Sequence, residues 1–186
     1  MLFDSGLPIP HNADILIICR HQAQVNCATM IFMNHLRSVE INDAWLKIWL
    51  VIDELDRVQQ VLFQPPTGEI TYLKNHPYRQ LFRQYMAGDY QALNQMKIIL
   101  PTGDFRRVVL EQMRQIPTGQ TLSYSQLANL AGHPGAARAV GSICKHNPLP
   151  IIIPCHRIIK SDGSLGEYAF GAELKKQLLR HEGVNF

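Results

Sequence analysis

The sequence predicts a mixed α/β fold in which a β-rich first half precedes a mainly helical second half. Residues 45–63 contain two β-rich runs around an acidic turn, whereas residues 104–145 contain three segments with helical apolar spacing. The 186 residues are 46% hydrophobic, which suits one globular domain or two small ones. The segment 96–101 is the candidate boundary between the two parts.

The first half is predicted to contain a β-hairpin followed by a helix. The runs 45–51 and 57–63 flank the acidic turn 53–56, and Pro65-Pro-Thr-Gly68 ends the second run. A helix is predicted over 76–93 because its apolar side chains recur at i, i+3, i+4, i+7 and i+8. These side chains, expected to pack in the core, are Tyr78, Leu81, Phe82, Tyr85 and Met86.

The second half is predicted to begin with three helices. The first covers 104–116 and is amphipathic, with an apolar stripe of Phe105, Val108, Val109, Met113 and Ile116. The second begins with the capping-box spacing of Ser123 and Gln126. A turn at 132–135 leads to the third helix, over 136–145. Two short helices across a glycine-containing turn resemble a helix-turn-helix, although ordinary helical hairpins share this pattern.

Charge is distributed unevenly along the chain. Residues 1–100 carry 8 basic and 9 acidic side chains, whereas residues 101–186 carry 10 basic and 6 acidic ones. The segment 112–161 contains no Asp or Glu, yet it includes Arg114, Arg138, Lys145, Arg157 and Lys160. This pattern predicts a surface for a polyanion, with drift in composition as the alternative.

Composition excludes several other classes of protein. No apolar run approaches the roughly 18 residues of a membrane helix, and the N-terminal residues do not resemble a signal peptide. We therefore expect a soluble, cytoplasmic protein with no membrane partner. The chain has four cysteines: Cys19, Cys27, Cys144 and Cys155. Their spacing matches neither a disulfide framework nor paired zinc knuckles. Cys19, His21 and Cys27 fit no zinc spacing, so no metal is predicted, and residues 14–19 are compatible with a buried strand.

The third predicted helix has a surface suited to close approach. It offers mostly Ala, Gly and Ser, with Arg138 and Lys145 as its long polar side chains. Helices that distinguish bases in the major groove usually carry more such side chains. A small-residue helix with one arginine fits a narrow groove in which that arginine replaces a displaced base. Alternatively, Ala137, Val140 and Cys144 pack on the core, and both interpretations can hold on opposite helix faces.

The strongest chemical signal is the apolar, strand-like run 149–159, which brings together Cys155 and His156. A neighbouring imidazole and basic surroundings favour the nucleophilic thiolate. Adjacent strand residues face opposite sides, so Pro154 must break the strand or a water must relay the proton. The acids available to orient the base are Asp162, Glu167, Glu173 and Glu182, the last following a predicted helix at 173–180. Buried packing of the Cys-His pair is the alternative.

Several ordered motifs between about Leu100 and Gly183 resemble the O6-alkylguanine-DNA alkyltransferases. These are Ala136-Ala-Arg-Ala-Val-Gly141, Asn147-Pro148, Pro154-Cys-His-Arg-Ile158 and Leu179-Arg-His-Glu-Gly183. The resemblance implies two domains. Residues 1–98 would form an N-terminal α/β (ribonuclease H-like) domain with a small antiparallel sheet. Residues 99–186 would form a mainly helical domain with the helix-turn-helix.

The resemblance also implies roles for individual residues. Cys155 would accept the alkyl group, His156 would act as base through water, and Glu182 would orient His156. Asn147 would brace the turn before the active-site segment, and Tyr124 would aid nucleotide rotation and protonate the departing guanine. DNA-binding positions would be Arg138, Ala137, Lys145 and Ser123, with Arg138 replacing the flipped nucleotide. Pocket positions would be Pro150, Ile158, Tyr168, Ala169 and Lys175.

The implied activity is irreversible, stoichiometric transfer of an alkyl group, chiefly methyl, from O6 of guanine in double-stranded DNA to Cys155. It needs no cofactor, and a monomer is expected. The sequence departs from the family pattern at Leu110, Thr118 and Phe170, the last on the pocket loop. Two rivals from other classes are a sequence-specific DNA-binding regulator, which would not need Cys155, and a cysteine hydrolase, which would turn over acyl substrates.

Overall fold

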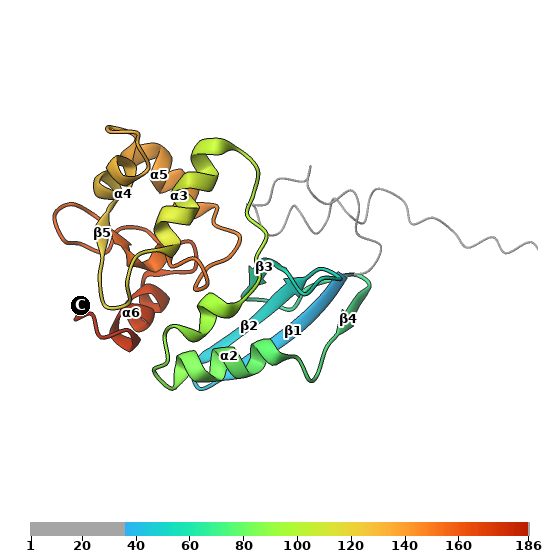
Figure 1. Cartoon of the computed structure of the whole chain (residues 1–186). Coiled ribbons are helices and arrows are strands. Elements are labelled where there is room, and N and C mark those ends of the chain that lie inside the picture. Colours follow the sequence, from blue (N-terminus) through green and yellow to red (C-terminus); the bar gives the residue numbers. More distant parts are fainter. Residues whose placement is uncertain (1–35, 186) are drawn as a thin grey trace, which may run out of the picture.

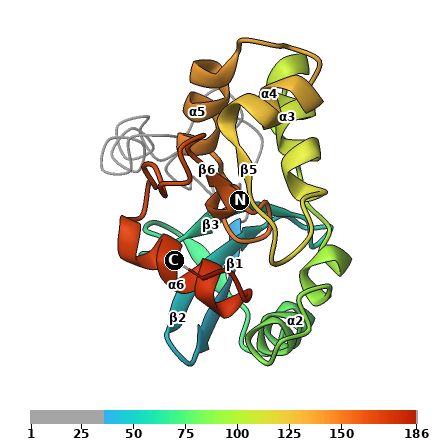
Figure 2. The same ribbon diagram turned by 90° about the vertical axis from the view of Figure 1, so that its left-hand side faces the viewer.

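The computed structural model describes residues 36–185, which form a mixed α/β fold (Figure 1). Figure 2 shows helices α3, α4 and α5 gathered at one end of the molecule and the sheet at the other. The strand predicted at 14–19 and the side chains of Cys19, His21 and Cys27 lie outside the described residues. No helix within 36–185 is long and apolar enough to cross a membrane.

The sheet has the order β3-β2-β1-β4. Strands β2 (Leu46–Ile52) and β3 (Val58–Leu62) are antiparallel, which confirms the predicted hairpin. The Asp53 carboxylate accepts the backbone N–H groups of Leu55 and Arg57, and so closes the turn between these strands. Two further strands of this sheet were not predicted from the sequence. They are β1 (Leu36–Asp43), antiparallel to β2, and the short β4 (Ile70–Tyr72), parallel to β1.

Helix α2 (Pro77–Met86) packs against β1 through the predicted apolar face, with Tyr78, Phe82 and Tyr85 buried. The helix is shorter than predicted, and only a 3-10 turn, η2 (Ala92–Gln95), follows it. Gly88 explains the early end, because its φ of +100° suits glycine far better than other residues. The boundary segment that follows runs beside β3. There the Val58 N–H donates to Lys97 O, and the Val58 carbonyl accepts from Ile99 N–H.

The three helices predicted in the second half are present as α3 (Asp104–Arg114), α4 (Tyr124–Leu130) and α5 (Ala137–Lys145). Ser123 and Gln126 form the expected capping box at the start of α4. The last helix, α6 (Ala172–His181), matches the prediction near the C-terminus. A two-residue strand, β5 (Leu122–Ser123), pairs in parallel with β6 (Ile158–Ile159).

The run 149–157, expected to be strand-like, is a turn instead. Pro150 and Pro154 lack backbone N–H groups, and Ile151 has a left-handed φ of +74°. Residues 155–157 then form a 3-10 turn, η3 (Cys155–Arg157), before β6 begins. Pro154 therefore breaks the extended run. This was one of the two alternatives that the sequence left open, the other being a water that relays the proton. A continuous hydrophobic core joins this turn to the sheet and the helices.

Candidate active site

Asn147 fixes the turn that carries Cys155. Its side-chain Nδ2 donates to Ile153 O at 2.8 Å and to Cys155 Sγ at 3.2 Å, while its Oδ1 accepts from Leu149 N–H at 3.0 Å. One buried amide therefore spans the turn and contacts the sulfur. Cys155 itself is only 4% exposed.

His156 is completely buried, and its Nε2 lies 2.9 Å from Oε1 of Glu182. Burial alone would raise the pKa of Glu182, but hydrogen bonds from His156 and Arg157 lower it to about 2. An ionised carboxylate only accepts hydrogen bonds, so Nε2 of His156 carries the proton and Nδ1 presents a lone pair. That Nδ1 atom is buried and has no hydrogen-bond partner among the described residues. The geometry selects Glu182 from the four acids that the sequence left open.

Two side chains in this network were given other roles by the sequence: Arg157 was placed in the predicted surface for a polyanion, which its burial contradicts, and Tyr85 in the core. Arg157 forms a buried ion pair with Glu182, with Nε to Oε2 at 2.7 Å and Nη2 to Oε1 at 2.9 Å. Tyr85, from α2, donates its hydroxyl to Oε1 of Glu182 at 2.9 Å. Arg157 lies inside the motif that marked His156, so its basic charge was the available signal. Tyr85 was predicted only as a core residue, and its hydroxyl was the overlooked feature.

Opposing effects act on the Cys155 thiol. Its pKa is raised above the ordinary value, because burial outweighs the lowering by the Asn147 amide and the Lys175 ammonium. The thiolate that the sequence pattern favoured is therefore not the resting form. Burial also lowers the pKa of His156, and Glu182 opposes that shift. At neutral pH the site therefore combines a protonated thiol with a neutral imidazole, which are the starting forms for proton transfer from sulfur to nitrogen.

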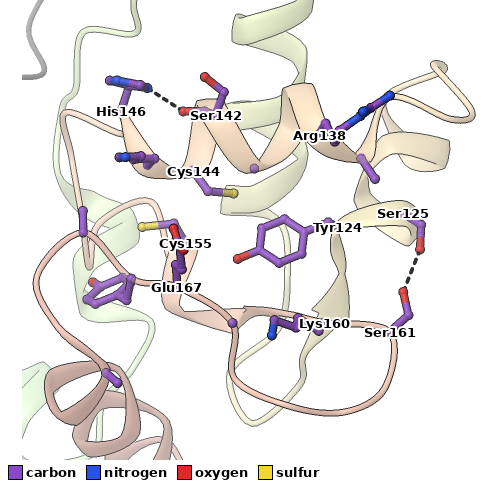
Figure 3. Close-up of a pocket in the computed structure, with 17 residues that line it drawn as sticks. Tyr124, Ser125, Arg138, Ser142, Cys144, His146, Cys155, Lys160, Ser161 and Glu167 are labelled. Atoms are coloured by element: carbon purple, nitrogen blue, oxygen red, sulfur yellow. Dashed lines mark hydrogen bonds between the residues drawn. The ribbon is translucent and has the colours of Figure 1, made fainter.

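Cys155 opens onto a pocket of about 1220 Å³ between α5 and the loop after β6 (Figure 3). Of the predicted site residues, the pocket is lined by Tyr124, Ala137, Arg138, Lys145, Cys155, Tyr168 and Ala169. The basic side chain of Lys160 also lines it, as does Glu167, an acid just beyond the acid-free segment. Figure 3 places exposed Arg138 at the end of the pocket opposite Cys155.

The hydroxyl of Tyr124 fits into the pocket because Gly166 lacks a side chain. A Cβ on Gly166 would lie 3.1 Å from the Tyr124 hydroxyl, whereas one on Gly141 would make only an ordinary contact, 3.9 Å from the Tyr124 ring. Gly166 has a φ of +69°, which also suits glycine. Burial raises the pKa of Tyr124 to about 12, so this hydroxyl remains a proton donor at neutral pH.

Other predicted pocket and DNA-binding residues lie outside the pocket lining. Pro150 and Ile158 are buried, and the Ile158 carbonyl accepts from Lys175 Nζ at 2.6 Å. Lys175 also donates to Leu165 O, so it joins the active-site segment to the pocket loop from inside. Burial lowers the pKa of Lys175 to about 8. Ser123 is buried and caps α4.

Two other positions noted in the sequence are also placed by the structure. Phe170, on the pocket loop, stacks on Phe63 with ring centroids 4.2 Å apart. Cys144 lines the same pocket as Cys155, and burial raises its pKa well above the ordinary value. Within residues 36–185, no group of three or more side chains is arranged to bind a metal.

Replacing Asn147 by alanine is expected to destabilise the protein by about 2 kcal/mol, because Ile153 O and Leu149 N–H lose their partner in a buried turn. The pKa of Cys155 should rise, since a hydrogen bond to the sulfur is lost. Urea unfolding measures the first effect, and the pH dependence of iodoacetamide labelling at Cys155 measures the second. Asn129→Ala, on the exposed side of α4, is the control and should change stability by less than about 0.5 kcal/mol. Equal effects of the two variants would contradict the bracing role.

The fold and site together define a class of protein: one with a buried, hydrogen-bonded cysteine beside a neutral imidazole, opening onto a pocket beneath two short helices. Comparisons with known proteins narrow this class. Residues 104–184 match the family described as "6-O-methylguanine DNA methyltransferase, DNA binding domain".

Curated relatives and solved structures extend the match beyond that segment. The methylated-DNA–protein-cysteine methyltransferase of Shigella flexneri is 34% identical over 152 residues, covering 73% of this chain and 89% of the relative. The mouse (Mus musculus) protein of the same name is 50% identical over 80 residues, 42% of this chain and 38% of the relative. The crystal structure of Mycobacterium tuberculosis OGT in complex with DNA superposes with a TM-score of 0.68 at 28% identity, covering 79% and 93% of the two chains. The chain belongs to the methylated-DNA–protein-cysteine methyltransferase family.

Proposed function

We propose that this protein repairs DNA by moving a methyl or other alkyl group from O6 of guanine to Sγ of Cys155, once per molecule. Family membership supports an alkyl transferase that acts on DNA. The observation that carries the assignment to Cys155 is its position on the pocket, braced by Asn147 and adjacent in the chain to the buried His156–Glu182 pair.

In the proposed reaction, an S–C bond forms at Cys155 while the bond between the alkyl carbon and O6 breaks. The thiol proton passes through a water to Nδ1 of His156, and the departing guanine receives a proton from Tyr124. The proton on His156 then returns through solvent to the Tyr124 oxygen, so that both side chains end neutral. Displacement at an alkyl carbon forms no tetrahedral carbonyl intermediate, so it requires no oxyanion hole. The thioether product is not hydrolysed by a neighbouring base, so the reaction is stoichiometric.

DNA is proposed to bind through α4 and α5 acting as a helix-turn-helix in the minor groove. Helix α5 presents small residues with exposed Arg138 and Lys145, which favours close approach over reading many bases. The lesion must leave the base stack to reach a buried sulfur. Arg138, at the far end of the pocket from Cys155, is suited to fill the space that the flipped nucleotide leaves.

The pocket proposed to receive the flipped base is lined on its loop side by Tyr168 and Ala169. Lys175 would hold that loop from inside through Leu165 O.

For the first part of the chain, we propose a ribonuclease H-like relationship and a domain boundary between residues 98 and 99. The antiparallel β3-β2-β1 meander, continued by a parallel β4, supports that relationship. We further propose that the protein acts as a monomer.

Duplex DNA carrying a labelled methyl group on O6 of guanine tests this function. We expect one methyl group per protein molecule, mapped by mass spectrometry to the peptide containing Cys155. Label on another residue, or none, would contradict the assignment, and more than one methyl per molecule would contradict the single-use reaction. Tight sequence-specific binding to unmodified DNA without transfer would indicate a regulator, and turnover of acyl esters would indicate a hydrolase.

A further inference from the structure

The network around Glu182 receives one member from the sheet-containing part of the molecule. Tyr85 lies at the end of α2, whereas Glu182 follows α6 near the C-terminus. Both side chains are buried, and the Tyr85 hydroxyl donates to Oε1 of Glu182 at 2.9 Å. This bond connects the first part of the chain directly to the partner of the His156 base.

We propose that Tyr85 is a positioning residue for alkyl transfer, which holds Glu182 in the orientation that leaves Nδ1 of His156 free to accept the thiol proton. The inference rests on the proposed function. It assigns a role in the reaction to a residue of α2, in the sheet-containing part of the molecule, which does not line the pocket.

The arrangement of donors around Glu182 supports this role. Oε1 accepts from Tyr85, from Nε2 of His156 and from Nη2 of Arg157, each at 2.9 Å, while Oε2 accepts from Nε of Arg157 at 2.7 Å. Arg157 holds both carboxylate oxygens in a bidentate pair. The Tyr85 hydroxyl adds a donor from a different part of the chain to Oε1, which is the oxygen that His156 contacts.

The Tyr85 ring is itself held rigidly. It makes edge contacts with the rings of Tyr90 and His181, with centroids 5.7 and 5.1 Å away. His181 Nε2 donates to Tyr85 O at 3.0 Å, and the Tyr90 hydroxyl donates to His181 O. Burial and the nearby carboxylate raise the pKa of Tyr85 well above its ordinary value, so the hydroxyl remains a donor. The end of α2 and the end of α6 are thus joined immediately before Glu182.

The Tyr85 hydroxyl also affects the charge that His156 experiences. The groups acting on His156 are Glu182, which favours its protonated form, and Arg157 and Lys175, which oppose it. A donor on Oε1 draws carboxylate charge away from the imidazole and so works with the two cations. Removing that donor should strengthen the pull of Glu182 and raise the pKa of His156.

The test compares Tyr85→Phe with Tyr90→Phe in the full chain. Each variant loses one hydroxyl from the same aromatic cluster, but only Tyr85 contacts the carboxylate. Single-turnover methyl transfer from O6-methylguanine DNA is followed as a function of pH. We expect Tyr85→Phe to react about three- to tenfold more slowly at neutral pH, with its acid limb moved to higher pH. Tyr90→Phe should keep the wild-type midpoint.

The outcomes separate the inference from the function on which it rests. A wild-type protein that transfers no methyl group would overturn the proposed function. A wild-type protein that transfers methyl, with Tyr85→Phe matching Tyr90→Phe in rate and midpoint, would overturn the inference alone. NMR provides a reading that does not depend on the variant folding. In the wild type, the Tyr85 hydroxyl proton and the His156 Nε2 proton should both be observed and share a cross-peak, and exchange-broadened, unconnected protons would also overturn the inference.

Discussion

Replacing Cys155 by alanine is expected to abolish methyl transfer while leaving binding to methylated DNA intact. The sulfur is the proposed acceptor, and alanine removes it without adding bulk to a buried turn. The other thiol on the pocket, Cys144, does not substitute for it, because Asn147 contacts the sulfur of Cys155 and the His156 base is adjacent to Cys155 in the chain. The exposed side chains Arg138 and Lys145 remain in place, so affinity for DNA should change by less than about twofold.

The matched control for this variant is Cys144→Ala, which removes a thiol from the same pocket. That variant should still accept one methyl group per molecule. Label transfer from O6-methylguanine DNA measures the reaction, and fluorescence anisotropy with the same duplex measures binding. Transfer that persists in Cys155→Ala would disprove the acceptor assignment. Loss of both transfer and binding would mean that Cys155 acts chiefly in packing.

Local sequence patterns were sufficient to predict those elements that are stabilised by near neighbours. The hairpin around Asp53 and the capping box at Ser123 and Gln126 are set by residues two to four positions apart. Strand β4 was missed because it has only three residues and pairs with a strand more than 30 positions earlier. Strand β1 was missed although its antiparallel partner β2 follows it directly in the chain. Helix α2 was extended too far because the signal of Gly88 was outweighed by the apolar pattern.

Residue type and motif were sufficient to predict which residues carry the chemistry of the site, but not how the fold positions them. Cys155 and His156 were identified from their own segment, but the shape of that segment was not, because the bracing contacts of Asn147 cross six to eight residues. The choice of Glu182 came from family resemblance and is confirmed as a contact of His156 by the structure. Tyr85 could not be found from the sequence, because a tyrosine on an apolar helix face has the pattern of a core residue.

Several basic side chains of the acid-free segment 112–161 lie on the surface of the pocket. Arg138, Lys145 and Lys160 line one pocket together with Cys155, so four residues spread over 23 positions face a common space. Arg157, from the same segment, is instead buried against Glu182. The basic excess therefore has two uses: part of it can attract phosphates, and part neutralises the carboxylate behind His156.

Replacing Glu182 by glutamine is expected to slow methyl transfer about 100-fold or more and to destabilise the protein by about 3–5 kcal/mol. The destabilisation arises because Arg157 would be a buried cation without its counter-charge. The slower reaction arises because a glutamine amide can donate to Nε2 of His156. The proton would then reside on Nδ1, and the imidazole would lose the lone pair that accepts the thiol proton.

The pH dependence of stability provides a second measure of the same residue. The pKa of Glu182 is about 2 in the folded protein, below the ordinary value of 4.5. Its contribution is therefore complete above pH 4.5 and is lost as the pH falls toward 2. Urea unfolding between pH 2 and 7 should show this loss in the wild type and a smaller one in Glu182→Gln. Glu173→Gln, at an exposed position of the adjoining α6, should retain the wild-type pH dependence and the wild-type transfer rate. If Glu182→Gln also retained both, the carboxylate would neither orient His156 nor neutralise Arg157, and the role proposed for Glu182 would be wrong.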